Sequence, residues 1–275
     1  MRIDDIVKQA LIEDLGSGDI TTDFLDLAQK HISAYIVSKQ DGVLCGLQVA
    51  LLVFKNVDES IKCIAYKKDG DFVKKGDTFL KIEGYSNSIL KAERVALNFL
   101  QRMSGIATMT RLFVEAIKPY QAKLLDTRKT TPLHRDLEKY AVKIGGGFNH
   151  RFGLYDMVLI KENHIRSVGS ISEAVNLVKK HNTTYKIEVE VTSLEELEEA
   201  SKCGVDRVML DNMDIEMIYE AVQKYSSLVE LEVSGNVSLE TINKIASTGV
   251  DFISCGALTH SYKSMDFSLI FMEGI

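Results

Sequence analysis

Short apolar runs alternate with amphipathic stretches through the second half of the chain. The apolar runs are rich in β-branched residues, which is typical of strands buried on both faces; they lie at residues 124–125, 157–160, 187–191, 208–210, 229–233 and 252–255. Helical spacing of apolar positions marks the stretches at 134–144, 171–181, 194–202, 214–224 and 238–247. This βα repeat predicts a parallel barrel or a doubly wound sheet. No G-x-G-x-x-G segment follows the first strand, which weakens the dinucleotide-binding version.

The first third of the chain has a different pattern. Helical spacing over residues 3–15 and 86–118 predicts two helices, and Gly105 is expected to break or bend the second. Between them, residues 31–85 read mainly as strands and turns, with one short helix. The hairpin spacing D-G-x-x-V-x-x-G-D also occurs in lipoyl and biotinyl carriers. Because no lysine stands at its tip between methionine-like neighbours, a structural hairpin is favoured.

Composition narrows the class of protein. The 275 residues are 45% hydrophobic and 26% charged, with a formal net charge of −6, as expected for a soluble enzyme. No apolar run approaches the roughly 20 residues that span a bilayer, and the acidic balance argues against nucleic acid as a partner. The four cysteines form no C-x-x-C pair, which predicts reduced thiols in a cytoplasmic protein and neither a disulfide framework nor a zinc site.

Positive charge is nevertheless concentrated in one region. Residues 123–166 contain nine Lys or Arg against five Asp or Glu, together with three His. Polar or small residues also follow every predicted strand: Asp126, Arg128 and Lys129, then Lys161, Glu162 and His164, then Glu190, then Asp211 and Asn212, then Ser234 and Gly235, then Gly256 and Ala257. In a βα barrel the carboxyl ends of the strands form the active-site face. A single charged residue there is more often a solvated loop start, but six consecutive strand ends favour an active site.

The residue types divide the candidate site by chemistry. Arg128, Lys129, Arg151 and Lys161 can hold carboxylates and phosphates. Acids cannot bind anions, but Glu190 and Asp211 can bind Mg²⁺ or sugar hydroxyls. Glycine-containing loops offer backbone N–H groups to a phosphate; these loops are Ser234-Gly235-Asn236 and Cys255-Gly256-Ala257. Together they predict a site for a phosphorylated sugar that carries a diphosphate and a metal.

At this point the chain resembles a known family, the decarboxylating quinolinate phosphoribosyltransferases. The resemblance covers nearly the whole chain and rests on these segments: ALIEDLGSGDITT near the start, ERVALN, SGIAT, DTRKTTP, GGGFNHR, LIKENHI, LDNM and GALTH. One departure is Leu133, where many members have glycine. With the βα pattern, the resemblance implies an α/β fold with two domains. An N-terminal α/β sandwich would span residues 1–105, and an open (β/α) barrel resembling a TIM barrel would span 106–275. The last helix, 266–275, would pack on the N-terminal domain.

The resemblance also implies an activity and roles. The family joins quinolinate to phosphoribosyl diphosphate, with Mg²⁺, and releases nicotinate mononucleotide, diphosphate and CO₂. By carry-over, quinolinate would be held by Thr127, Arg128, Lys129, His150 and Arg151 of one subunit and by Arg94 from the other subunit of a homodimer or higher multiple. Lys161, Glu190 and Asp211 would be catalytic, with the two acids also near the magnesium diphosphate. The loops at Ser234, Gly235, Asn236, Cys255, Gly256 and Ala257 would grip the 5′-phosphate.

Three alternatives stay open on the sequence. Lys161 at a strand end also fits a Schiff-base lysine, as in aldolases. A related phosphoribosyltransferase-like protein associated with molybdenum transport shares part of the motif set. A non-catalytic ligand-binding barrel that kept the pocket is the third. The acids Glu190 and Asp211 together with the complete set of cations favour the quinolinate enzyme.

Overall fold

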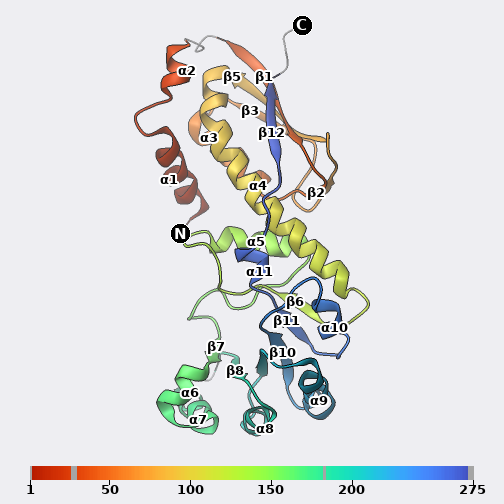
Figure 1. Cartoon of the computed structure of the whole chain (residues 1–275). Helices are drawn as coiled ribbons and strands as arrows, with labels where there is room; N and C mark the ends of the chain where they lie inside the picture. Colours follow the sequence, from red (N-terminus) through yellow and green to blue (C-terminus); the bar gives the residue numbers. More distant parts are fainter. Residues whose placement is uncertain (1, 26–29, 182–183, 272–275) are drawn as a thin grey trace. The chain divides into compact units, whose positions relative to one another are not determined.

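The computed structural model of the chain describes residues 2–25, 30–181 and 184–271 (Figure 1). It divides into two compact units that do not follow a single cut in the sequence. Unit 1 combines the chain up to Arg111, the segment Thr131–Gly146 and the segment from Tyr262 onward, and unit 2 combines Leu112–Thr130 with Gly147–Ser261. No helix in the described part of the chain is long and apolar enough to cross a membrane.

Unit 1 is built on an antiparallel sheet with strand order β12-β1-β5-β3. Residues along β1 and β5 alternate in burial, because successive side chains of a strand point to opposite faces. The strands of the sheet are β1 (His31–Ser38), β3 (Lys62–Ala65), β5 (Thr78–Tyr85) and β12 (Phe267–Phe271), and a separate pair is formed by β2 (Gly42–Val43) and β4 (Phe72–Val73). The turns before β4 and β5 contain Gly70 and Gly76 with positive φ, in agreement with the predicted hairpin.

Five helices among the described residues begin in unit 1: α1 (Ile3–Leu15), α2 (Ile20–Phe24), α3 (Leu47–Val57), α4 (Ser86–Ile117) and α5 (Arg135–Gly145). The prediction of a break at Gly105 is wrong, because α4 runs unbroken through it. The glycine is needed for a close approach instead. A Cβ at Gly105 would lie 2.4 Å from the carbonyl oxygen of Lys263, so the segment before β12 can pack directly on the helix.

The C-terminal segment does join the N-terminal sheet, but the expectation of a helix over 266–275 is wrong within the described residues. Phe267–Phe271 forms β12, which pairs antiparallel with β1 from Ser38↔Phe267 to Ala34↔Phe271. Residues 272–275 lie outside the described part. The pairing satisfies backbone groups of β1 that would be unpaired if β1 were the edge of the sheet. Pairing in the sheet therefore overrides the helix expected for this segment.

Helix α5 was expected in the barrel, and the structure places it in unit 1 instead. Arg102 of α4 forms an ion pair with the fully buried Glu138 of α5. Arg111 donates through Nε to the carbonyl oxygen of Gly145 at 2.9 Å. Burying Glu138 beside Arg102 compensates a charge that would otherwise be costly, and this pairing fixes α5 against α4.

The turn before α5 contains the departure from the family noted above. Leu133 adopts φ +67° and the residue is 70% exposed. The left-handed conformation that glycine takes without cost is therefore kept by a leucine, at roughly 1–2 kcal/mol of strain.

Unit 2 is a parallel sheet of six strands with order β6-β11-β10-β9-β8-β7. Helix α8 packs on strands β8 and β9, and helix α9 packs on strand β10. The elements are β6 (Lys123–Leu125), β7 (Val158–Ile160), α6 (Glu162–Val168), α7 (Ile171–His181), β8 (Ile187–Val191), α8 (Leu194–Lys202), β9 (Arg207–Asp211), α9 (Ile215–Tyr225), β10 (Glu230–Ser234), α10 (Ile242–Ala246), β11 (Phe252–Ser254) and α11 (Ala257–His260). Strands β6 and β7 are the two edges, which is the open arrangement predicted.

Candidate active site

The carboxyl ends of the strands in unit 2 surround a cavity of about 690 Å³. Its wall includes every site residue predicted for this half of the chain: Thr127, Arg128, Lys129, His150, Arg151, Lys161, Glu190, Asp211, Ser234, Gly235, Asn236, Cys255, Gly256 and Ala257. Arg94, the remaining predicted residue, lies on an exposed face of α4 in unit 1. Side chains separated by up to 130 residues therefore meet because parallel strands end at one edge.

The cations on one side of the cavity come from the loops after β6 and before β7. Arg128 carries a buried Nε for which the described residues offer no hydrogen-bond partner. Arg151 donates through a terminal guanidinium nitrogen to the carbonyl oxygen of Met157 at 3.2 Å and is 8% exposed. Burial, and then repulsion from Arg128, lower the pKa of Arg151. Two crowded guanidinium groups, one with an unsatisfied donor, are well suited to an anion that would neutralise them.

Lys161 and Glu190 form an ion pair at the mouth of the cavity, where the lysine side chain is 43% exposed and the carboxylate 15%. Lys161 is also the N-cap of α6, and its backbone N–H donates to Nδ1 of His164 at 2.9 Å. The Schiff-base alternative requires a free amine in an apolar pocket. Lys161 is paired with an acid instead, which favours a role in holding charge.

The loops after β9 and β10 are joined by their asparagines. Asn212 donates from Nδ2 to Asp211 at 2.8 Å, and Asn236 donates from Nδ2 to Asn212 at 3.1 Å. Both asparagines have a positive φ, +55° at Asn212 and +50° at Asn236. Gly235, directly before Asn236, has a φ of +94°. A Cβ on Gly235 would lie 2.2 Å from Oδ1 of Asn212. The glycine is therefore required for the close packing of two loops that present backbone N–H groups.

The loop after β11 packs against Lys129. Thr259 donates from Oγ1 to the carbonyl oxygen of Lys129 at 2.8 Å. A Cβ on Gly256 would lie 2.9 Å from the Lys129 side chain and 3.1 Å from Nε2 of His260. Cys255, beside this glycine, is buried, and its burial raises the pKa of the thiol, so it is unsuited to act as a thiolate nucleophile.

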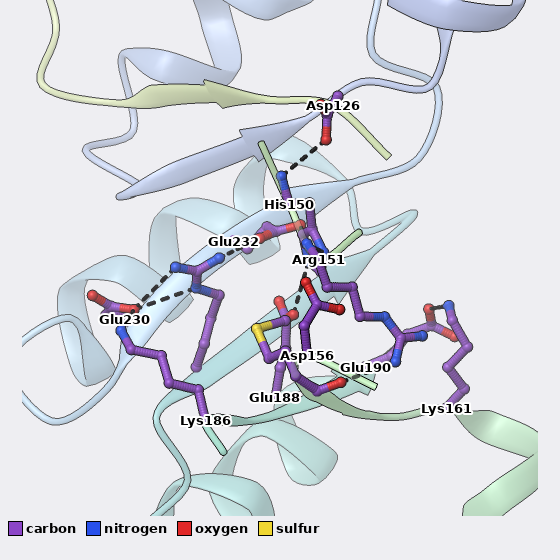
Figure 2. A network of polar contacts seen from close by, with 12 residues as sticks. Asp126, His150, Arg151, Asp156, Lys161, Lys186, Glu188, Glu190, Glu230 and Glu232 are labelled. Carbon is purple, nitrogen blue, oxygen red and sulfur yellow. Dashed lines mark hydrogen bonds and ion pairs between the residues drawn. The ribbon is translucent and has the colours of Figure 1, made fainter. Parts of the chain in front are cut away.

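Beneath the mouth lies a buried ionic layer, formed by His150, Glu188 and Glu232 (Figure 2). The half-buried Arg207 completes the layer. Glu188 and Glu232 stand two residues before Glu190 and Ser234 on their strands, so they share the inward face with the cavity residues above. Nε2 of His150 lies 2.9 Å from Glu188 and 3.6 Å from Glu232. Arg207 donates through a terminal guanidinium nitrogen to Glu232 at 2.9 Å.

Burial shifts the titration of both acids in this layer. It raises the pKa of Glu188 to about 7, against the opposing effect of Arg207. Burial, followed by repulsion from Glu188, raises the pKa of Glu232 to about 7. One oxygen of each carboxyl is buried with no hydrogen-bond partner among the described residues. Two carboxyl groups that cannot both ionise cheaply hold a proton near neutral pH.

Several residues of the site were missed from the sequence. The cavity wall also contains Leu159, Met209, Val237 and Ser254, and the ionic layer was not predicted at all. Period-two spacing was the available signal, because Leu159, Met209 and Ser254 stand two residues before Lys161, Asp211 and Gly256. His260, at the end of the GALTH segment, also lines the cavity.

Comparisons with known proteins point to the same family along nearly the whole chain. The model for the N-terminal domain of quinolinate phosphoribosyl transferase matches residues 19–104, and the model for its C-terminal domain matches 106–270. The chain is 46% identical over 284 residues to a chloroplastic nicotinate-nucleotide pyrophosphorylase (carboxylating) of Arabidopsis thaliana, covering 96% of this chain and 81% of the relative. It is 41% identical over 270 residues to a probable nicotinate-nucleotide pyrophosphorylase (carboxylating) of Bacillus subtilis (strain 168), covering 98% and 93%.

A solved structure is similar throughout. The nicotinate-nucleotide pyrophosphorylase from Francisella tularensis superposes with a TM-score of 0.95 at 44% identity, covering 98% of this chain and 96% of that one.

Proposed function

The chain belongs to the quinolinate phosphoribosyltransferase family, and from that premise we propose how its cavity carries out the reaction. The enzyme joins quinolinate to phosphoribosyl diphosphate and yields nicotinate mononucleotide, diphosphate and CO₂, in the biosynthesis of NAD. One observation carries the proposal: a single cavity brings together cations for a dicarboxylate, two acids for a ribosyl group, and two glycine loops for a phosphate.

Quinolinate occupies the cationic side of the cavity in this proposal. Its two carboxylates are held by Arg128, Lys129 and Arg151, and Thr127 and His150 complete the subsite. The Nε of Arg128 supports this arrangement, because a carboxylate supplies the acceptor that the described residues do not. Nicotinate has one carboxylate fewer and leaves part of the cationic wall unneutralised, so the site selects the dicarboxylate.

Phosphoribosyl diphosphate occupies the opposite side. Its 5′-phosphate lies at the loops of Ser234, Gly235 and Asn236 and of Cys255, Gly256 and Ala257. The ribose lies near Glu190 and Asp211, and Lys161 stands between the two substrates. Anions bind readily to backbone N–H groups that glycine leaves accessible, and these loops are the part of the cavity with that character.

The chemistry then requires positioning more than covalent catalysis. The ring nitrogen of quinolinate forms a bond to C1 of the ribose while the bond from C1 to the diphosphate oxygen breaks. Positive charge develops on the sugar, and Glu190 and Asp211 stabilise it electrostatically. The new pyridinium ring accepts the electron pair of the adjacent carbon–carboxylate bond as CO₂ departs, and a proton then replaces the carboxylate on that carbon.

Mg²⁺ is the proposed metal. The donor set of Glu190 and Asp211 fits it, because carboxylate oxygens are the ligands that Mg²⁺ prefers, and so small a set suits an ion held mainly by substrate phosphates. When bound, the ion neutralises charge on the leaving diphosphate. Removal of divalent metal with EDTA should abolish turnover, and Mg²⁺ should restore it. Full activity in EDTA would refute the metal requirement.

Arg94 is proposed to act across the interface of a homodimer or higher multiple, reaching the quinolinate of a neighbouring subunit. Its exposed position on α4, in the other compact unit, supports a role outside its own cavity wall. Mixing inactive Arg94→Ala with inactive Lys161→Ala subunits should restore activity, because mixed dimers contain one site with both residues. Full activity of a monomeric preparation would contradict the proposal.

We also propose that the enzyme works in the cytoplasm. All four cysteines are free in the structure, which suits a reducing compartment. Fractionation of the source cells, with detection of the protein in each fraction, would test the location. Recovery in an organelle or in a secreted fraction would contradict it.

The activity itself is tested by mass spectrometry with quinolinate, phosphoribosyl diphosphate and Mg²⁺, and with nicotinate in parallel. Nicotinate mononucleotide and CO₂ should form from quinolinate and not from nicotinate. In Arg151→Ala, the KM for quinolinate should rise by roughly a hundredfold, because a charge-assisted contact to carboxylate is lost. Arg166→Ala, on the surface of α6, is the matched control and should leave KM unchanged. An unchanged quinolinate KM in Arg151→Ala would contradict the assigned subsite.

A further inference from the structure

His150 forms a link between the quinolinate subsite and the buried ionic layer. Its Nδ1 accepts a hydrogen bond from the backbone N–H of Arg151 at 2.8 Å, and its Nε2 faces Glu188 at 2.9 Å. Its own backbone N–H donates to the carboxylate of Asp126 at 2.9 Å (Figure 2). The ring is thus held from both sides, and one of its contacts fixes the main chain of the arginine in the cavity wall.

These contacts assign the tautomer of His150. A neutral imidazole has one protonated nitrogen and one acceptor. Because Nδ1 accepts the N–H of Arg151, the ring proton lies on Nε2, which faces the carboxylate of Glu188. The doubly protonated ring would have no acceptor at Nδ1 and would lose the contact to Arg151. The acceptor beneath Nε2 is therefore what keeps the ring in the form that Arg151 needs.

That acceptor is Glu188, and its surroundings hold it in place. The residue is fully buried on β8 and has Glu232 beside it on β10. Arg207 on β9 pairs with Glu232 at 2.9 Å and with Glu230 at 3.1 Å. These contacts anchor the layer at the side away from the cavity.

The same cluster has the composition of a metal site, since His150, Glu188 and Glu232 each offer a ligand atom within 4.8 Å of the others. A metal would need the lone pair of Nε2. The contact from Arg151 to Nδ1 leaves that nitrogen protonated instead, so the geometry favours a proton between the ring and the acid over a cation.

We propose that Glu188 is a positioning residue for quinolinate: by accepting the Nε2 proton of His150 it holds Nδ1 as an acceptor, and so fixes Arg151 in the cavity wall. The proposal rests on the function proposed above. Glu232 and Arg207 support the acceptor from beneath. Outer contacts of this kind act through the residues that they orient, and losing one typically lowers affinity by 10- to 100-fold.

Two substitutions of similar size separate this role from simple packing. Glu188→Met fills the space but offers no oxygen, so the KM for quinolinate should rise about tenfold while the KM for phosphoribosyl diphosphate changes less than twofold. Glu188→Gln keeps an acceptor oxygen and should restore the quinolinate KM to within about threefold of the original. Glu198→Met is the control, because Glu198 lies on α8, pairs with Lys202 and is 52% exposed; it should leave both KM values unchanged.

Nitrogen-15 NMR of the His150 ring, identified by its loss in His150→Asn, tests the same idea without any assay of activity. The unsubstituted enzyme should show protonated Nε2 and unprotonated Nδ1, and Glu188→Met should lose that pattern.

The opposite tautomer, an imidazolium, or a stoichiometric metal that changes the ring signals on chelation would overturn the proposal. Equal rises in both KM values would also overturn it. An unsubstituted enzyme with the expected tautomer but no turnover would contradict the proposed function and leave the positioning contact intact. If Glu188→Met fails to fold, the ring signals of the unsubstituted protein and of Glu188→Gln still decide the question.

Discussion

Replacement of Arg207 by methionine should destabilise the protein by an amount that depends on pH. The arginine side chain is 13% exposed, lies 2.9 Å from the fully buried Glu232 and stacks 3.7 Å from the centre of the Phe252 ring. Methionine keeps much of the apolar contact but removes the counter-charge. A buried carboxylate left without its partner costs about 3–5 kcal/mol, so we expect a loss of about 3 kcal/mol above neutral pH.

The sign of the pH dependence follows from Glu232. Burial raises its pKa to about 7, above the ordinary 4.5, and removal of Arg207 raises it further. Below pH 6 the carboxyl is already protonated in the variant, and only a hydrogen bond worth about 1 kcal/mol is lost. As pH rises through 7, the variant must ionise the group unpaired or hold a proton at about 1.4 kcal/mol per pH unit. The destabilisation should therefore grow with pH.

Urea unfolding at pH 6 and pH 8.5 measures both quantities. Far-UV circular dichroism is the suitable signal, because the chain contains no Trp. Arg207→Met combined with Glu232→Leu removes both charges and should recover stability to within about 1 kcal/mol of the original protein. A loss below about 1 kcal/mol at pH 8.5, or the same loss at both pH values, would show that Glu232 does not depend on Arg207.

Two further substitutions follow from backbone conformation. Leu133→Gly should raise the free energy of unfolding by about 0.5 kcal/mol, because relief of left-handed strain slightly exceeds the entropy that glycine adds to the unfolded chain; a loss above about 1 kcal/mol in thermal unfolding would mean that the exposed side chain packs against something. Gly235→Ala should raise the KM for phosphoribosyl diphosphate at least tenfold, because its Cβ would meet Asn212 at 2.2 Å. Gly76→Ala is its control, with the same φ of +94° and no atom within 4 Å, and should change stability but not KM; equal KM values for both variants would contradict the loop argument.

The sequence predicted the parallel half of the fold most accurately, and the reason is physical. A strand buried on both faces is apolar along most of its length, so the predicted run 157–160 matches β7 to within one residue. Many of the mouth residues were also recoverable, because they stand at or just after the carboxyl end of such a run. Both signals are local, and they need no knowledge of which strand lies next to which.

The missed features depend on contacts between elements that are far apart in the sequence. Glu188 and Arg207 look like the polar positions of ordinary half-exposed strands, and only the neighbouring strands turn those positions into a buried layer. Helix α5 has an apolar face, but its sequence does not say which surface that face covers. In the structure, the ion pair between Arg102 and Glu138 settles its place.

The pairing of β12 with β1 has a consequence for synthesis of the protein. Strand β1 ends at Ser38, whereas its partner begins at Phe267, so the neighbour on one edge is made 229 residues later. At about 5–20 residues per second, the ribosome leaves that edge open for roughly 10–50 s. An open strand edge is a template for association with other chains. The nascent protein is thus most exposed to aggregation while its catalytic half is being translated, and a chaperone that covers β1 during this interval would raise the yield of folded enzyme.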